Sequence, residues 1–244
     1  MQALSGARLK LQRANKHISD SETAVISLKH AYVSSIETHA PTGGHSIKYE
    51  CPRFSDLVNE IALITGDAIH NLRASLDHAW VSIIRHLKLP VTKWTKFPFA
   101  ESAEALDKTL GERKIVSASP ALFKKISAEV QPYRGGNALL WALHDADIAD
   151  KHKLLIPLVD YMSVVDLSVE DEHGPVTGNT LPRRGSNGIF YVDFAPNIKI
   201  HSKGQIVLSV LFDEGTALED MGIPDELHAL SRVVEQTMTG LECL

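Results

Sequence analysis

Six side chains suited to acid–base or binding chemistry fall within thirteen residues, from Gly66 to His78. Between them, Ile69, Leu72 and Leu76 follow the spacing of an amphipathic helix. An ordinary exposed helix would use Lys and Glu, which form helices more readily than His and Asp. The segment therefore predicts polar groups that are held in place beside a core. The six are Asp67, His70, Asn71, Arg73, Asp77 and His78.

These polar residues share one side of the predicted helix. With His70 at 0° and about 100° per residue, Asp77 falls near −20°, Arg73 near −60° and His78 near +80°. The whole set spans a sector of roughly 160°. Arg73 and Asp77 have i,i+4 spacing, but such an ion pair stabilises a helix by only about 0.2–0.5 kcal/mol. Helix stability alone is a poor reason for this choice of residues.

A second predicted helix, at 138–153, has a similar composition. His144, Asp147 and Lys151 share one face at i, i+3 and i+7, and Asp145 and His152 lie on the neighbouring face. A single histidine on a helix is more often structural than catalytic. Two helices with the same unusual side chains instead predict a polar seam between them, formed by the polar residues of 66–78 and 138–153.

The order Arg73-Ala74-Ser75-Leu76-Asp77-His78 is an Arg-x4-His motif. It resembles the signature of HEPN-type helical domains, in which Arg-x4–6-His lies on a long helix of a bundle. Many HEPN proteins are metal-independent RNases that work as dimers, with two copies of the motif facing one cleft. Others bind nucleic acid or nucleotides without cleaving them.

The chain also resembles a group of uncharacterised bacterial proteins over about residues 8–155. This resemblance brings no known function. The matching motifs are Arg13-Ala14-Asn15-Lys16-His17-Ile18, Gly66-Asp67 with His70-Asn71-Leu72-Arg73 and Leu76-Asp77-His78, Gln131-Pro132-Tyr133, and Asp150-Lys151-His152.

The HEPN resemblance implies a role for each polar residue. His78 would be the general acid or base, Arg73 would hold the phosphate, and Asp77 or His70 would orient them. The expected function is a metal-independent ribonuclease or RNA-binding protein of defence or toxin type, acting on single-stranded RNA as a homodimer without a cofactor. Substrate contacts would come from Asn71, Lys151 and His152, with support from Asp67, His144 and Asp147.

Two alternatives remain open at this stage. Asp67-x-x-His70 and His144-x-x-Asp147 each place a carboxylate and an imidazole one turn apart, as in the metal sites of helical bundles, which would suit a metal-binding hydrolase. The other alternative is a non-enzymatic interaction protein. Its polar seam would be a buried network that fixes helix register, and the strands at 163–212 would bind a protein partner.

The periodicity predicts an α+β fold: an N-terminal helical bundle, then a small antiparallel β-sheet and a C-terminal helix. We expect a helical body at 1–155 and a β-rich unit with its closing helix at 156–244, packed as one globule. An aromatic link at 91–100 is expected to be packed, and 172–186 to be a loop. Helices are predicted at 4–38, 55–87, 102–111, 119–130, 138–153 and 224–240, and strands near 47–49 and within 163–212.

Composition narrows the class of protein. A net charge of −5 and a pI near 6.2 argue against a broad basic surface for nucleic acid, although a local basic cleft is compatible with them. Two cysteines are too few for a disulfide framework. No stretch approaches the roughly 20 apolar residues of a membrane span, and no signal peptide is recognisable. We therefore expect a cytoplasmic protein without a membrane contact.

Overall fold

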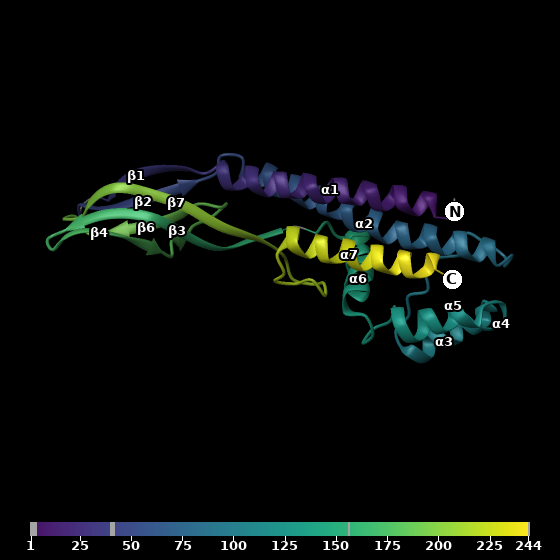
Figure 1. The fold of residues 1–244 in the computed structure, drawn as a ribbon. Helices are drawn as coiled ribbons and strands as arrows, with labels where there is room; N and C mark the ends of the chain where they lie inside the picture. Colours follow the sequence, from purple (N-terminus) through teal and green to yellow (C-terminus); the bar gives the residue numbers. More distant parts are fainter. Residues whose placement is uncertain (1–3, 40–41, 156, 244) are drawn as a thin grey trace. The chain divides into compact units, whose positions relative to one another are not determined.

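The chain has a mixed α+β fold with helices at both ends, as the sequence predicts (Figure 1). The computed structural model describes residues 4–39, 42–155 and 157–243, without the side chains of 161 and 162. It divides into two units. The helical unit comprises Met1–Ser21, Ala62–Leu155 and Phe212–Leu244, and the β unit comprises Glu22–Ile61 and Ile156–Leu211. Two long helices belong partly to each.

The helices follow the predicted positions closely after residue 50. The long polar helix, predicted at 55–87, is α2, Phe54–His86. The segment predicted at 119–130 is α5 followed by a π-helical turn, η1. The full set is α1 Ser5–His30, α2, α3 Ala103–Glu112, α4 Ile115–Ala118, α5 Pro120–Lys124, η1 Lys125–Val130, α6 Ala138–His152 and α7 Ile223–Glu242.

Side-chain caps start three of these helices. The Ser102 hydroxyl accepts a hydrogen bond from the Ala105 amide at 3.2 Å at the start of α3. Ser119 caps α5 in the same way, with Pro120 in the first turn. The Asn137 side chain caps α6 through the Leu140 amide at 3.1 Å. Such caps satisfy amides that the helix leaves unpaired, which confirms the predicted caps Ser119 and Asn137.

The apolar side of α2 forms the centre of the helical unit. Ile69, Leu72, Leu76 and Trp80 are completely buried there. Polar contacts join the surrounding helices in pairs. Lys10 of α1 donates to the Asn71 side chain at 3.3 Å, and Ser231 of α7 donates to Asn15 of α1 at 2.6 Å. The first contact places α1 beside the Asn71 side of α2, and the second joins α7 to α1.

The β unit contains two antiparallel sheets rather than the single sheet that the sequence predicts. The first has the strand order β1-β2-β6-β5 and the second β4-β3-β7. Cys51, which follows β2, is buried and free. The strands are β1 Val33–His39, β2 Gly44–Glu50, β3 Pro157–Asp171, β4 Gly174–Thr180, β5 Arg183–Arg184, β6 Phe190–Phe194 and β7 Lys199–Phe212.

Two expectations about local structure are wrong. The first helix ends at His30 instead of residue 38, because Val33, Ile36 and Thr38 belong to β1, where β-branched residues are favoured. The segment 172–186 is also not simply a loop, since it contains β4 and β5.

The units also divide the chain differently from the predicted boundary at 155. The first hairpin, 33–50, pairs with β6, for example Ile47 opposite Val192. Strand pairing therefore places residues 22–61 in the β unit, although they precede the polar helix in sequence.

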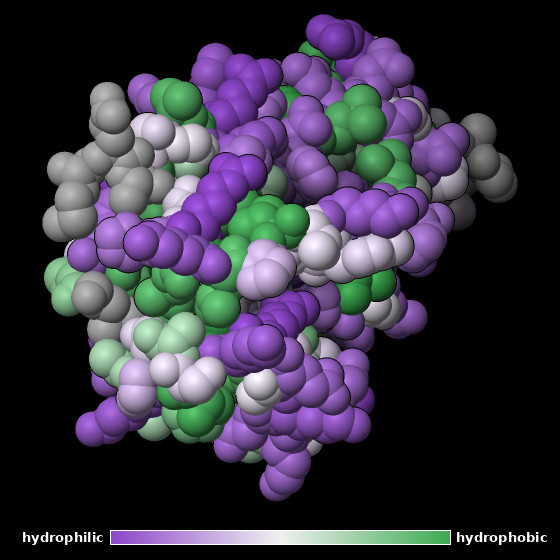
Figure 2. Space-filling model, turned by 90° about the vertical axis from the view of Figure 1, so that its right-hand side faces the viewer, coloured by the Kyte–Doolittle hydropathy of each residue, from purple (hydrophilic) through white to green (hydrophobic). Residues whose placement is uncertain are grey.

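Figure 2 views the molecule from the side that lies to the right in Figure 1, where apolar atoms show between hydrophilic ones. A pocket of about 450 Å³ in the helical unit is lined by Leu4 and by residues of α1, α2, α5 and α7, including Arg8, Ile83, Leu122 and Leu241. Among the described residues, no helix combines the length and the apolar character needed to cross a membrane.

A close backbone approach occurs where β3 meets β7. The pairing of β3 with β4 shifts between Val164 and Leu167, and Asp166 there has a φ of 56°. Gly204 of β7 has a φ of 68°, and a Cβ built on it would lie 2.5 Å from the carbonyl oxygen of Val165. Both the backbone conformation and the lack of space therefore require glycine at this position.

We expect Gly204→Ala to lower the free energy of unfolding by about 1–3 kcal/mol, because the methyl group meets backbone and the conformation is strained. Gly178→Ala, in β4, is the matched control, since nothing lies within 4 Å of a Cβ added at that position. It should change stability by no more than about 0.5 kcal/mol. Urea unfolding followed by circular dichroism measures both variants. Equal midpoints would contradict the close approach.

Candidate functional site

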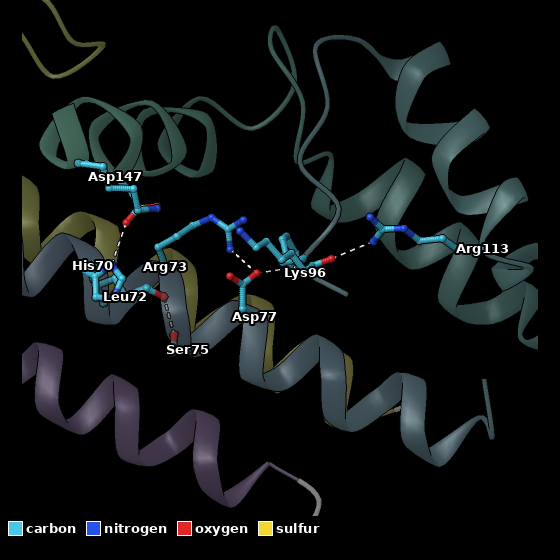
Figure 3. Close-up of polar contacts among 10 residues, drawn as sticks. His70, Leu72, Arg73, Ser75, Asp77, Lys96, Arg113 and Asp147 are labelled. Atoms are coloured by element: carbon cyan, nitrogen blue, oxygen red, sulfur yellow. Dashed lines mark hydrogen bonds and ion pairs between the residues drawn. The ribbon is translucent and has the colours of Figure 1, made fainter. Parts of the chain in front are cut away.

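The polar residues of α2 face two different neighbours. On one side, His70 contacts Asp147 of α6 (Figure 3). On the other side, Asn71 is bonded to Lys10 of α1. The exposed ring of His78 also lies on the α1 side, because a Cβ built on Gly6 would be 3.3 Å from its Nδ1. The single polar stripe expected from the sequence is therefore divided between two helix contacts.

Asp147 is the central acceptor of the polar seam. Its side chain is only 4% exposed, and each of its oxygens binds a different group. Oδ1 lies 3.2 Å from Nδ1 of His70, and Oδ2 accepts a hydrogen bond from Nζ of Lys151, one turn further along α6. The side chains of His70 and Lys151 are 57% and 49% exposed. A buried carboxylate thus orients two basic groups that remain open to solvent.

Two more carboxylates lie close to this arrangement. The Asp150 side chain packs over Gly66, where a Cβ would come within 2.6 Å of Oδ1. Burial raises the pKa of Asp150, and the neighbouring Asp147 and Asp67 raise it further. The absence of a side chain at Gly66 is what lets α6 bring Asp150 this close to α2. Asp67, Asp147 and Asp150 therefore place several carboxylates beside the two exposed basic groups, His70 and Lys151.

Asp77 joins α2 to the link that follows it. Its Oδ1 accepts a hydrogen bond from Nη1 of Arg73 at 2.5 Å and from the backbone amide of Phe97 at 2.7 Å. The next residue back, Lys96, accepts a hydrogen bond from Arg113 through its carbonyl oxygen at 2.9 Å (Figure 3). We call Asp77, Arg73 and Phe97 the Asp77 junction. It fixes the link against α2 although the link has no regular structure.

Aromatic rings cover the guanidinium of the junction. The Arg73 Cζ atom lies 4.5 Å from the centre of the Phe99 ring, and Phe99 stacks on His144 at 4.5 Å with an interplanar angle of 7°. Trp141 adds an edge contact to His144. Arg73 is only 6% exposed as a result. A guanidinium that is paired and covered in this way is not free to receive a phosphate within one chain.

His144 is held in its neutral form. Burial lowers its pKa to about 4, and the positive charge of Arg73 contributes in the same direction. Its Nδ1 and the Nε of Arg73 are buried without a hydrogen-bond partner among the described residues. A protonated His144 next to Arg73 would place two like charges in a poorly solvated space. This histidine therefore serves as an aromatic surface rather than as a charged group.

The structure brings together some of the predicted residues and separates others. His70, Asp147 and Lys151 form one cluster, and Arg73, Asp77 and His144 form a second. Asn71 is buried, and its amide nitrogen donates to the carbonyl oxygen of Asp67 at 2.8 Å. His78 and His152 are exposed outside these clusters. Within the described parts of the chain, no three His, Cys, Asp or Glu side chains are grouped to hold a metal ion.

The link at 91–100 contributes more than the sequence indicates. Its aromatic residues suggest a packed segment, and Phe97 is indeed only 2% exposed, with its ring edge-on to Trp80 at 5.9 Å. The contacts of Phe99 with Arg73 and His144 are not predictable from spacing, because the three residues lie on three different segments. Trp94, by contrast, is 70% exposed, contrary to the expectation that the link is packed.

Comparisons with protein-family models, curated proteins and solved structures found no match to this chain. The HEPN resemblance therefore remains a prediction that rests on the residues themselves.

We expect acid to destabilise the fold through His144. In the unfolded chain its pKa is about 6.5, so as the pH falls below that value the unfolded chain binds a proton that the folded chain excludes down to about pH 4. Stability then falls with pH, by up to about 1.4 kcal/mol per pH unit. His144→Phe keeps a ring against Phe99 but cannot titrate. Urea unfolding across this pH range should show a smaller acid-induced loss in this variant than in the wild type, and equal losses would contradict the assignment.

Proposed function

We propose that the protein binds and cleaves single-stranded RNA without a metal ion, and that His70 is its acid–base group. The observation that carries this proposal is the buried Asp147 carboxylate, which holds the exposed His70 and the exposed Lys151 on its two oxygens. A carboxylate on Nδ1 orients the imidazole and leaves Nε2 for a substrate. Lys151 adds positive charge for a phosphate.

The chemistry needs only these groups and a second proton donor. In the proposed reaction, His70 accepts the proton of a ribose 2′-hydroxyl as the hydroxyl oxygen attacks phosphorus. The new O2′–P bond forms while the P–O5′ bond breaks, giving a 2′,3′-cyclic phosphate and a 5′-hydroxyl. Lys151 stabilises the charge on the phosphate oxygens. In a homodimer, a second His70 would protonate the departing 5′-oxygen, which is consistent with the dimeric action that the HEPN resemblance implies.

This proposal changes the roles of the HEPN pair. Arg73 becomes a positioning residue, since Asp77 and Phe99 already occupy its guanidinium. His78 lies on the α1 side of α2, away from Asp147. Asp147 positions His70 rather than reacting itself.

A non-enzymatic role is the second candidate, and the Asp77 junction favours it. Arg73 pairs with Asp77 and is connected to His144 through the Phe99 ring within one chain, as expected of a network that fixes helix register. In that case the exposed His70 would have no chemical task, and its removal would change no activity.

We expect His70→Ala to reduce cleavage of single-stranded RNA by about 100-fold or more, because positioned acid–base groups contribute about 10²–10⁴ in rate. Asp147→Asn should also reduce cleavage, since it alters the support of His70. His78→Ala is the matched control on the same helix and should retain activity. The assay follows formation of the cyclic phosphate in the presence of EDTA, with circular dichroism confirming that each variant is folded.

Three outcomes would contradict this assignment. Loss of cleavage in His78→Ala but not in His70→Ala would return the site to the Arg73–His78 pair. Cleavage abolished by EDTA would indicate a metal-dependent enzyme. No cleavage of any RNA by the folded wild type would favour the non-enzymatic candidate.

A further inference from the structure

Trp94 is an exposed aromatic side chain in a segment that is otherwise well anchored. Its side chain is 70% exposed, whereas Phe97, three residues later, is buried against Trp80. Large aromatic rings contribute most to stability when they are buried. An exposed tryptophan on a fixed support is therefore a candidate binding surface.

Hydrogen bonds fix the backbone around this ring. The Trp94 amide donates to Oγ1 of Thr92 at 3.2 Å, and the Thr92 amide donates to Oγ1 of Thr95 at 2.9 Å. The Thr95 amide closes the turn on the Thr92 carbonyl oxygen at 3.0 Å. We call residues 92–95 the Trp94 turn. Because its backbone is already ordered, a ligand that contacts Trp94 loses little entropy in ordering the turn.

The Asp77 junction and Arg113 anchor the Trp94 turn to the helical unit. Asp77 holds the amide of Phe97, and Arg113 holds the carbonyl of Lys96 (Figure 3). Both contacts come within two residues of the turn. The junction therefore also helps to hold the Trp94 turn in a defined position.

A pocket lies beside the turn. Its volume is about 290 Å³, at the lower end of the range for small-molecule sites, which suits one base with its sugar. Trp80 lines it, and the indole Nε1 of Trp80 is buried without a hydrogen-bond partner among the described residues. The same pocket is lined by Trp94, Pro90, Arg113, Lys114 and Glu112.

The charges around the turn favour an anionic ligand. Lys88, Lys93 and Lys96 fall within 87–100, a stretch without any acidic residue in a chain of net charge −5. The Lys93 Nζ atom lies 4.9 Å from the centre of the Trp94 ring. Lys114 also lines the pocket and is exposed, and Glu112 carries the opposite charge there. Aromatic rings between lysines are typical of surfaces that bind single-stranded nucleic acid.

We propose that Trp94 is a stacking platform for a base of single-stranded RNA, with the surrounding lysines on its phosphates. The proposal rests on the RNA-binding part of the proposed function and names the surface that holds the substrate. Trp80 and Ile84 of α2 line the same pocket as Trp94 and lie ten and fourteen residues from His70, or about 15–21 Å along the helix axis.

The test uses a short 2′-O-methyl oligonucleotide, which lacks the attacking hydroxyl and so separates binding from cleavage. Trp94→Ala should weaken binding about 5- to 150-fold, the range for loss of one base–aromatic stack. Trp94→Phe should retain part of the affinity. Leu63→Ala, which removes an exposed apolar side chain from α2, is the control and should bind normally. Lys93→Gln should reduce the salt dependence of binding.

Tryptophan fluorescence supplies a direct readout of stacking. The oligonucleotide should quench the emission of the wild type, and Trp94→Phe should remove that quenching while Trp80 and Trp141 remain. Binding or quenching that is unchanged in the Trp94 variants, or the absence of binding by the wild type, would overturn the platform. A folded protein that binds more tightly than the oligonucleotide, and whose binding is lost in Trp94→Ala, would also overturn the platform, in favour of a protein-docking surface.

The two proposals fail in distinguishable ways. His70→Ala should lose RNA cleavage but keep the Trp94-dependent quenching by the oligonucleotide. Trp94-dependent binding without RNA cleavage would support the stacking platform and contradict the proposed nuclease activity. RNA cleavage that is unchanged in Trp94→Ala would support the nuclease and contradict the stacking platform.

Discussion

The double hydrogen bond accepted by Asp77 Oδ1 is the interaction on which the rest of the helical unit depends. One oxygen binds the Arg73 guanidinium and the Phe97 amide, so it fixes a buried charge and an irregular segment together. Without Asp77, the Arg73 guanidinium would be a buried charge without this partner, which destabilises a fold. This single anchor places the Phe97 ring against Trp80 and the Phe99 ring between Arg73 and His144.

A second carboxylate, Asp147, organises the other half of the polar seam with the opposite result. Asp77 fixes groups that become covered, whereas Asp147 is itself covered and holds groups that stay exposed. Burial of the acceptor and exposure of the donors is the arrangement that lets a histidine be oriented and still react. This contrast is the physical basis of our proposal that His70, rather than Arg73, is the reactive group.

Much of the local structure could be predicted from the residues alone. The amphipathic spacing of 54–86 gives α2, Ser119-Pro120 and Asn137 start α5 and α6, and alternation gives the strands at 190–194 and 199–212. Residues 33–39 were not predictable as a strand. Helical spacing of apolar residues continued up to Tyr32, and the pairing that selects a strand comes from β2.

The sequence by itself determined that His70, Arg73, Asp77, His144 and Asp147 lie on polar faces of two helices. Helical periodicity depends only on spacing, so the angles between these side chains were fixed before any packing was known. Only the tertiary structure decided which residues are covered and which are open. That choice depends on α1, α6 and the link at 91–100, which approach α2 from segments distant in sequence. Their packing covers Arg73 and leaves His70 and Trp94 exposed to solvent.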